Sequence, residues 1–212
     1  MVSEQARPAP VVVPIRSLGP EHRERIAAHL LSLTSDDRYL RFGYVATDEQ
    51  IQNYVGRLDF VNDDIFGIFN RRVEPTAVAH LAYWRDRKSA NCAEFSVSVL
   101  GKARGRGYGR RLFERAVLHA RNEGVELLFI HALSENVAML KIARSAGATL
   151  ERFGTETEAH LRLPPATLDT RMSELVDEQF AQTDYRLKQQ VKTFRDFLAG
   201  VQETRQGVRA AR

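Results

Sequence analysis

The chain has 212 residues and a mass of 24.1 kDa, a size that suits one domain with an appendage. Because 43% of its residues are hydrophobic and 27% are charged, it can bury a core, and disorder along its whole length is excluded. No apolar run approaches the ~20 residues that span a bilayer, and the first residues do not resemble a secretory signal. A single cysteine, Cys92, excludes an internal disulfide and a cysteine-rich zinc site. We therefore expect a cytoplasmic protein with no membrane segment and no metal site.

Positive charge is concentrated in one stretch of the chain. The formal net charge is +4, yet residues 85–111 alone carry eight Lys or Arg side chains and only two carboxylates. Such a stretch predicts either a polyanionic ligand or a solvated basic face. Few aromatic residues accompany these charges and no groove-reading motif is present, so we do not expect nucleic acid as a partner.

The first third of the chain predicts a flexible arm, a strand and short helices. Residues 1–10 are expected to be flexible, and residues 11–16 to form a strand. A helix follows from Pro20, and a cap cluster at 34–37 opens a short helical turn. Thr47 and Gln50 resemble a capping box in front of another apolar stripe.

The middle of the chain predicts a mixed α/β fold, with a mostly antiparallel sheet flanked by helices. Short β-branched or aromatic runs separated by polar turns predict strands, and apolar residues at helical spacing predict helices between the later strands. The predicted strands are 64–70, 76–85, 92–100, 127–132, 149–155 and 158–163, and the predicted helices are 107–124 and 135–146.

Pro164 and Pro165 mark a boundary. Residues 166–201 are expected to form a long helical extension, interrupted near Thr183, and residues 203–212 a flexible end. The apolar stripe of this extension must cover its own domain, a second copy or another partner. A homodimer through this helix is one of the expected arrangements.

A glycine-dense turn joins the strand 92–100 to the next helix. Gly105, Gly107 and Gly109 allow positive φ and close approach of a ligand to the backbone. The first N–H groups and the dipole of the following helix favour an anion, most naturally a phosphate or pyrophosphate. The spacing fits neither the dinucleotide fingerprint nor the phosphate loop of nucleotide hydrolases. A flexible turn without a ligand is the alternative.

The same turn resembles a known family. Arg104-x-x-Gly107-x-Gly109 after a strand is similar to the acyl-CoA pyrophosphate loop of the GNAT (GCN5-related) N-acetyltransferases. The segment from Asn136 to Gly147 resembles the second CoA-contacting segment of that family. Residues 31–42 resemble a branch that includes bacterial protein-lysine acetyltransferases. The resemblance covers residues 11–163 and implies a GNAT domain that uses acetyl-CoA to acetylate a primary amine, either a protein lysine or a small amine.

The resemblance also implies which residues contact acetyl-CoA. Val97 and Val99 would pair with the pantetheine arm like an added strand, and Asn136 would hydrogen-bond to it, unless Asn136 only begins its helix. The residues implied to hold the pyrophosphate are Arg104, Gly105, Arg106, Gly107, Tyr108, Gly109 and Arg110.

Acetyl transfer to an amine needs a base, because a free lysine amine has a pKa near ~10.4. Glu94, ten residues before Arg104, is the candidate, and the resemblance gives a glutamate on this strand that role. An ion pair or a wet strand edge is the alternative reading of Glu94. Many members of the family have a tyrosine that protonates the leaving thiolate where this chain has Ala143. Direct transfer is favoured over an acyl-enzyme on Cys92, because Cys92 has no recognisable activating base.

The remaining polar and aromatic candidates are expected to be structural. His80 and His131 are interpreted as core or rim histidines. Tyr83 and Trp84 are interpreted as core residues, with a place lining the acceptor channel as the alternative. Acidic residues crowd the segments that would border the acceptor side, which is compatible with a cationic acceptor or with ordinary capping. A non-catalytic acyl-CoA-binding module that acts through its C-terminal helix is the alternative function. The acidic residues are Asp36, Asp37, Asp48, Glu49, Asp63 and Asp64.

Overall fold

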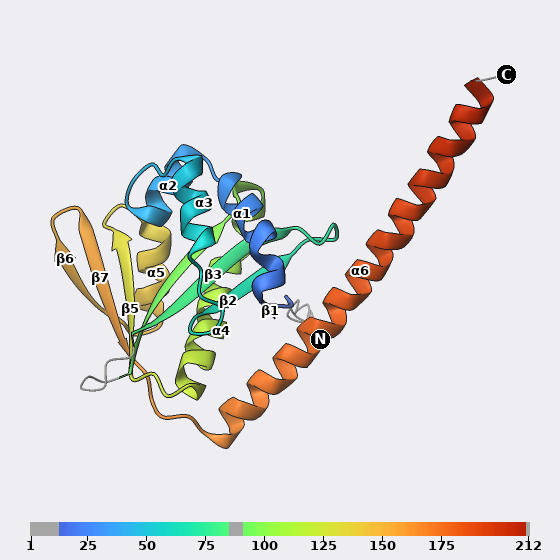
Figure 1. Ribbon diagram of the computed structural model, residues 1–212. Coiled ribbons are helices and arrows are strands. Elements are labelled where there is room, and N and C mark those ends of the chain that lie inside the picture. Colours follow the sequence, from blue (N-terminus) through green and yellow to red (C-terminus); the bar gives the residue numbers. More distant parts are fainter. Residues whose placement is uncertain (1–12, 85–90, 211–212) are drawn as a thin grey trace, which may run out of the picture.

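The computed structural model describes residues 13–84 and 91–210, with side chains up to residue 193. Seven strands in these residues form one sheet in the order β1-β2-β3-β4-β5-β7-β6 (Figure 1). All neighbouring strands are antiparallel except β4 and β5, which are parallel. The predicted mixed, mostly antiparallel sheet is thus confirmed. The strands are β1 (Arg16–Ser17), β2 (Asp64–Phe69), β3 (Pro75–Trp84), β4 (Cys92–Val99), β5 (Leu127–Leu133), β6 (Thr149–Phe153) and β7 (Glu156–Arg162).

The helices begin where the sequence places its caps. Thr34 Oγ1 accepts a hydrogen bond from the Asp37 N–H, and Thr47 and Gln50 form the predicted capping box, which satisfies first-turn donors. The helices are α1 (Arg23–Leu31), α2 (Ser35–Phe42), α3 (Asp48–Gly56), α4 (Tyr108–Asn122), α5 (Val137–Ser145) and α6 (Leu168–Ala210), with 3₁₀ turns η1 (Pro20–His22) and η2 (Gly101–Ala103). In the described part of the chain, no helix combines the length and apolar character needed to cross a bilayer.

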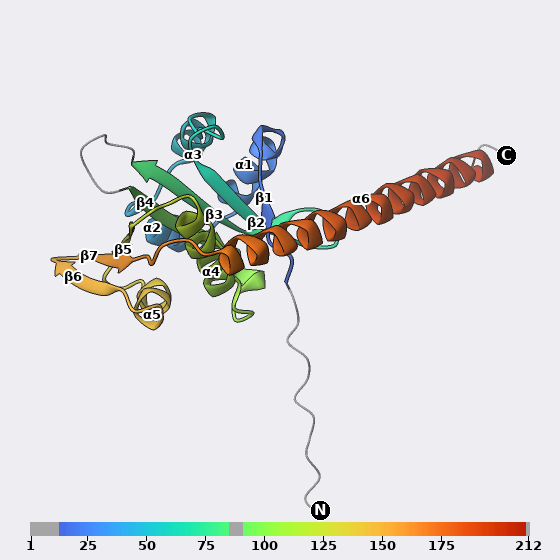
Figure 2. The same cartoon turned by 90° about the horizontal axis from the view of Figure 1, so that it is seen from below.

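Helices cover both faces of the sheet at β2 and β3, so most residues of these two strands are buried on both sides. On β3, Ala77 and Leu81 belong to the core cluster beneath α4 and α5, whereas Val78 belongs to the cluster beneath α1 and α3. Successive strand residues point to opposite faces, so a single strand supplies both cores. Figure 2 shows α4 and α5 on one side of the sheet and α1 and α3 on the other.

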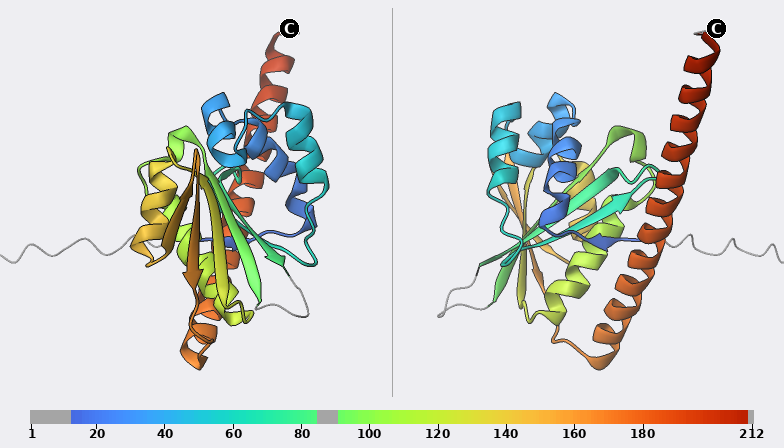
Figure 3. Two further views of the ribbon diagram at one scale, coloured as in Figure 1. Left: turned by 90° about the vertical axis from the view of Figure 1, so that its left-hand side faces the viewer. Right: turned by 45° about the vertical axis from the view of Figure 1, so that its right-hand side comes forward.

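Strands β4 and β5 separate part-way along their length. Their register pairs Cys92, Ala93 and Glu94 with Leu127, Leu128 and Phe129, and pairing ends there, although β4 runs on to Val99 and β5 to Leu133. The sheet therefore opens in a V beyond Glu94 (Figures 1 and 3). Backbone edges and side chains of both strands border the gap.

Among its described residues, the predicted strand 11–16 is wrong at residues 13–15 and confirmed at Arg16. Only Arg16 and Ser17 pair, with Gly67 and Phe66 of β2. Pro14 cannot donate a ladder hydrogen bond, and Val13 and Ile15 pack against the core beneath α4 instead. Residues 11 and 12, and the predicted flexible arm 1–10, lie outside the described residues.

The C-terminal helix is longer and more regular than the sequence predicts. It runs without interruption through Thr183 and past Val201 to Ala210, where a flexible end was expected from residue 203. Thr183 Oγ1 donates to the Gln179 carbonyl at 2.9 Å, and Lys188 pairs with Asp184 at 2.7 Å. Both polar side chains at the predicted break are therefore bonded within the helix. Residues 211 and 212 are not described.

The first half of α6 packs on α4 and β1, and the rest extends beyond the domain (Figures 1 and 2). Arg115 of α4 is buried and pairs with Glu174 at 2.6 Å and with Glu178 at 3.2 Å. Farther along, Tyr185 is buried against Phe69 and beneath the Arg16 guanidinium. Among the described positions of the predicted apolar stripe, only Tyr185 is buried on the domain, and the others are exposed.

Candidate functional site

A cleft of about 680 Å³ occupies the gap between β4 and β5. Its walls are the end of β4, the glycine turn with the start of α4, the start of α5, and α2. The cleft lies where β4 and β5 have separated, because the space between the two unpaired strands is not filled by the helices that pack on the sheet. Segments from most of the domain therefore meet at this site.

The alternation of β4 directs two sets of side chains to opposite faces. Ala93 and Phe95 are buried in the core beneath α4, as the sequence predicts. The polar set is also covered: Ser98 is buried, and its hydroxyl lies 2.8 Å from His29 Nε2 of α1. The polar face of this strand is thus an internal surface between β4 and α1, and Glu94 lies on that face.

The glycine turn adopts the geometry that its composition predicts. Gly105 and Gly107 have φ values of +75° and +74°, a region that residues with a Cβ avoid. A Cβ on Gly109 would lie 3.4 Å from Ile142 Cδ1, so the turn, α4 and α5 are in close contact. No side chain caps the first turn of α4. Its unpaired N–H groups and dipole therefore favour an anion at the cleft.

Arg104 of this turn is ion-paired with Asp37 of α2. The Asp37 side chain is buried, whereas that of Arg104 is 53% exposed, so the pair ties α2 to the turn and leaves part of the guanidinium in solvent. The two residues are 67 positions apart, and nothing in the sequence connects them.

Asn136 both borders the cleft and caps α5. Its Oδ1 accepts from the Met139 N–H at 3.1 Å, and its Nδ2 donates to the Leu40 carbonyl of α2 at 3.4 Å. Beside it, a hydrogen bond from Tyr39 to Glu135 raises the pKa of the Tyr39 phenol. These contacts join α2 to the start of α5 across one end of the cleft. The alternative that Asn136 begins its helix is therefore true, and it does not exclude a ligand contact.

Nine of the ten residues predicted to contact acetyl-CoA line this one cleft. The exception is Arg106, which is exposed and lies outside the lining. Because side chains from β4, the glycine turn and α5 converge here, the predicted set forms a single site. The nine are Val97, Val99, Arg104, Gly105, Gly107, Tyr108, Gly109, Arg110 and Asn136.

Glu94 lies at the point where β4 and β5 part, paired in register with Phe129 and Ala82. It is half-buried and does not line the cleft itself. It is close enough to His80 for its charge to favour the imidazolium form, although burial is the larger effect and holds the pKa of His80 below its usual value. Glu94 is thus adjacent to the cleft at its narrow end.

A chain of hydrogen bonds runs from beneath β3 to the cleft. His80 Nε2 lies 3.0 Å from Asp63 Oδ2, and His80 Nδ1 lies 2.8 Å from the Tyr54 hydroxyl. Arg41 donates to the same hydroxyl at 2.9 Å and lines the cleft. His80 is therefore a bonded, mostly buried histidine, as predicted. The sequence identifies neither Tyr54 nor Arg41 as a site residue, since they come from different helices.

Two aromatic rings and a histidine share the sheet face of Glu94. Trp84 is 51% exposed and stacks on Phe129, with centroids 5.5 Å apart, so its predicted core position is wrong. The reason is its place at the end of β3, beyond the helices that cover that strand. His131 follows Phe129 by two residues on β5, is exposed and lines the cleft. Ala143, by contrast, is fully buried in the core.

The acidic residues predicted to border the acceptor side are mostly held by other groups. Asp37 pairs with Arg104, Asp48 with Arg38 and Asp63 with His80. Asp64 points to the opposite face of the sheet, where it contacts His119 of α4 at 2.8 Å. In the described residues, no group of three or more His, Cys, Asp or Glu side chains is arranged to hold a metal ion.

Comparisons with known proteins agree with this geometry. A family model described as the acetyltransferase (GNAT) family matches residues 27–148. The GNAT domain of S. lividans PAT superposes with a TM-score of 0.60 at 20% identity, over 70% of this chain and 89% of that one. YncA from Salmonella typhimurium, solved with its cofactor acetyl-CoA, gives 0.55 at 18% identity, over 74% and 96%. Ribosomal-protein-alanine N-acetyltransferase from Brucella melitensis gives 0.54 at 19% identity, over 70% and 99%. At these identities the structural likeness establishes a shared fold.

Proposed function

Because the chain belongs to the GNAT acetyltransferase family, and is therefore an acyltransferase, we propose that it moves an acetyl group from acetyl-CoA directly to a primary amine with Glu94 as general base. The observation that carries this proposal is the cleft between β4 and β5, which joins an anion-favouring turn to a carboxylate at its narrow end. The family assignment sets aside the alternative of a non-catalytic acyl-CoA-binding module.

The wide end of the cleft is suited to the pyrophosphate of acetyl-CoA. The N–H groups at the start of α4 and the neighbouring Arg110 would hold its negative charge. Gly105 and Gly107, whose positive φ leaves the backbone uncovered, allow close approach. Next along the cleft, Val97 and Val99 lie on the edge of β4 that β5 has left, which suits an extended, amide-containing arm. This order would direct the thioester toward Glu94.

The acceptor amine would reach the thioester from the sheet face of Glu94. Glu94 would accept the amine proton, directly or through water, so that the neutral amine attacks the carbonyl. Trp84 and Phe129 offer an exposed aromatic surface beside it, which suits the methylene chain and cation of a lysine. We propose a protein lysine as the acceptor, with small amines as the second class to assay. Because Ala143 stands where many family members have a tyrosine, the thiolate would leave unassisted or take its proton from another group.

Replacing Glu94 with glutamine tests the proposed base. We expect kcat to fall by about 10²–10⁴-fold, the usual contribution of a positioned base, while the dissociation constant of acetyl-CoA stays unchanged because Glu94 does not line the cleft. His131→Asn is the matched variant, since His131 is the other titratable side chain on this face that borders the cleft. An unchanged kcat in Glu94→Gln, with a loss in His131→Asn, would transfer the role to His131.

The outer face of α6 supports the proposal of a homodimer. Seven large apolar residues on it are between 48% and 83% exposed, and they recur at spacings typical of a helix-pairing seam. Residues 168–184 carry one basic side chain and five carboxylates, of which Glu174 and Glu178 face the domain, whereas residues 185–210 carry six basic side chains and two carboxylates. Two copies of α6 in antiparallel orientation would therefore bring opposite charges together. The seven residues are Leu168, Met172, Leu175, Val176, Phe180, Leu187 and Val191.

Light scattering over a range of protein concentrations tests this dimer. We expect twice the chain mass for the full chain and the chain mass alone for Leu175→Gln combined with Leu187→Gln. Because both residues are exposed, the substitutions leave the domain core intact. Gln179→Ala combined with Gln190→Ala, also at exposed α6 positions, is the matched control. A full chain that stays monomeric at every concentration would refute the dimer.

A further inference from the structure

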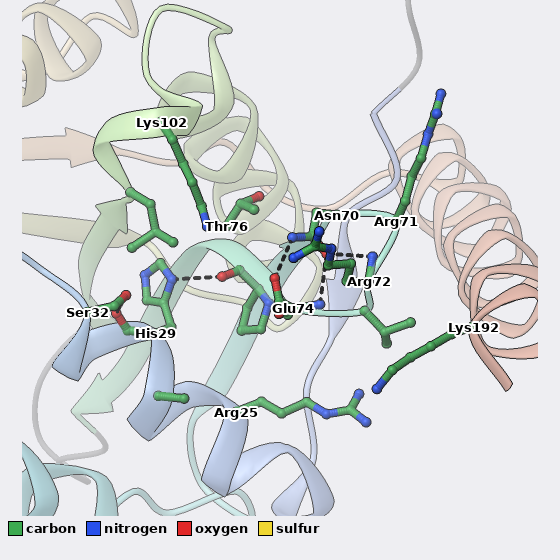
Figure 4. Close-up of a pocket in the computed structure, with 14 residues that line it drawn as sticks. Arg25, His29, Ser32, Asn70, Arg71, Arg72, Glu74, Thr76, Lys102 and Lys192 are labelled. Atoms are coloured by element: carbon green, nitrogen blue, oxygen red, sulfur yellow. Dashed lines mark hydrogen bonds between the residues drawn. The ribbon is translucent and has the colours of Figure 1, made fainter. Parts of the chain in front are cut away.

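A second cavity, of about 560 Å³, lies behind the glycine turn. It is enclosed by α1, the turn between β2 and β3, η2 and α6 (Figure 4), and we call it the basic pocket. None of its lining residues lines the cleft between β4 and β5. The two hollows are nevertheless adjacent: Leu100 borders the basic pocket, and the preceding Val99 borders the cleft.

The lining of the basic pocket is strongly cationic. Five Lys or Arg side chains and one carboxylate, that of Glu74, border it. Glu74 is already bonded to the Asn70 amide at 2.8 Å. Among the residues that the structure describes, none of the five cations forms an ion pair with a carboxylate. The cations are Arg25, Arg71, Arg72, Lys102 and Lys192.

Two of these charges approach each other, and a third lies on the far side of the cavity. Figure 4 shows the head groups of Arg25 from α1 and Lys192 from α6 pointing toward one another, and Lys102 entering from the other side. Arg71 points away from the cavity. The Arg25 guanidinium is held in place by the Tyr185 hydroxyl. Like charges that converge in a partly enclosed space repel, and a bound anion removes that repulsion.

The floor of the basic pocket is polar but uncharged. His29 is 2% exposed; burial lowers its pKa to about 4, so the ring is neutral at physiological pH. Nδ1 lies 3.1 Å from the Pro75 carbonyl, which can only accept, so Nδ1 carries the proton and Nε2 accepts from Ser98. Among the described residues, no Phe, Tyr or Trp side chain lines the pocket. It therefore offers no ring on which a nucleobase would stack, and its recognition chemistry is that of charge.

We propose that the basic pocket binds a small molecule carrying two or more phosphate groups, recognised through those phosphates. Arginine forks and lysine ammonium groups are the side chains that bind phosphate oxygens most strongly. The excess of cations over carboxylates suits a diphosphate or a higher phosphate better than a single phosphate. The site is separate from the acetyl-CoA cleft, so this inference goes beyond the proposed acetyl transfer.

Calorimetric titration with inorganic pyrophosphate at low ionic strength tests the proposal, in the full chain and in two variants of equal charge. We expect a binding event that weakens as salt is raised and that depends on the cations of the basic pocket. In Lys102→Gln combined with Lys192→Gln, affinity should fall by about tenfold or more for each cation removed. The matched control is Arg57→Gln combined with Arg144→Gln, which removes the same charge from exposed side chains that line neither hollow.

Two results would overturn the inference. One is the absence of pyrophosphate binding to the full chain. The other is an equal loss of affinity in the pocket variant and in the control variant, which would indicate general charge attraction. Because the comparison is between two variants of equal charge, it remains valid whether or not the cleft binds acetyl-CoA. The titration is repeated with ADP. An affinity equal to that of pyrophosphate indicates recognition of the phosphates alone, whereas a higher affinity for ADP indicates recognition of the nucleoside.

Discussion

Replacing Glu174 with glutamine tests how α6 is held on the domain. The carboxylate of Glu174 accepts hydrogen bonds from Arg115, His119 and Asn122 of α4. Burial alone would raise its pKa, but these bonds outweigh burial and lower the pKa from 4.5 to about 2. A shift of that size corresponds to about 3 kcal/mol of interaction with the charged form. The variant also leaves the buried Arg115 with Glu178 as its only carboxylate partner among the described residues.

Hydrogen exchange measured by mass spectrometry detects the loss of α6 stability in Glu174→Gln directly. Glutamine keeps one acceptor oxygen, so we expect the free energy of opening of α6 to fall by about 2–3 kcal/mol, a 30- to 150-fold increase in its opening constant. Peptides covering residues 168–185 should exchange faster by that factor, whereas peptides from β3 should not change. Asp177→Asn is the control, because Asp177 is exposed on the same helix. If the two variants exchange at equal rates, the account of α6 docking is wrong.

Two further predictions concern pH and the glycine turn. Burial would lower the pKa of His119, but Asp64 and Glu174 raise it from 6.5 to about 9. The stability that the charged His119 gives to the docking of α6 is therefore complete below pH 6.5 and is lost as the pH rises through about 9. The stability that the charged Glu174 contributes is present above pH 4.5 and is lost as the pH falls through about 2. The protection of α6 against hydrogen exchange, corrected for the intrinsic exchange rate, should therefore be greatest between about pH 4.5 and 6.5. Protection that does not change with pH would contradict this prediction. Gly107→Ala places a Cβ at a φ of +74°, which should cost about 1–2 kcal/mol, lower the Tm by roughly 2–8 °C and weaken acetyl-CoA binding. Gly101→Ala, where φ is not positive and a Cβ meets nothing within 4 Å, should do neither, and equal effects would show that the backbone of the turn is not special.

The parts of the site that depend on local sequence were predictable. Some features depend only on residues within a few positions of one another, so the sequence alone indicates them. They are Gly107 with the helix that follows it, the capping box at Thr47, and Asn136 at the start of α5. The polar and apolar alternation of β4 placed Val97 and Glu94 on opposite faces of the sheet for the same reason. Val97, Gly107 and Asn136 line one cleft because the strand order of the fold brings their segments together.

What the sequence could not supply are contacts made between distant segments. The pair of Arg104 and Asp37 joins residues 67 positions apart, and the basic pocket collects charges from α1, the β2–β3 turn, η2 and α6. Only Lys102 of that set belongs to the basic stretch 85–111, part of which (85–90) lies outside the described residues. The position of Trp84 was mistaken because its burial depends on where the covering helices end, and hydrophobicity alone does not indicate this.

Thermal unfolding with acetyl-CoA tests most directly that the cleft between β4 and β5 is an acetyl-CoA site. The experiment uses the Lys102→Gln, Lys192→Gln variant, so that the basic pocket does not contribute, with NAD as the control ligand. At about 100 times its dissociation constant, a ligand adds roughly 2.7 kcal/mol of stability, which for a chain of this size raises the Tm by roughly 5–11 °C. We predict that rise with acetyl-CoA and little change with NAD. No rise at saturating acetyl-CoA would contradict the assignment of the cleft.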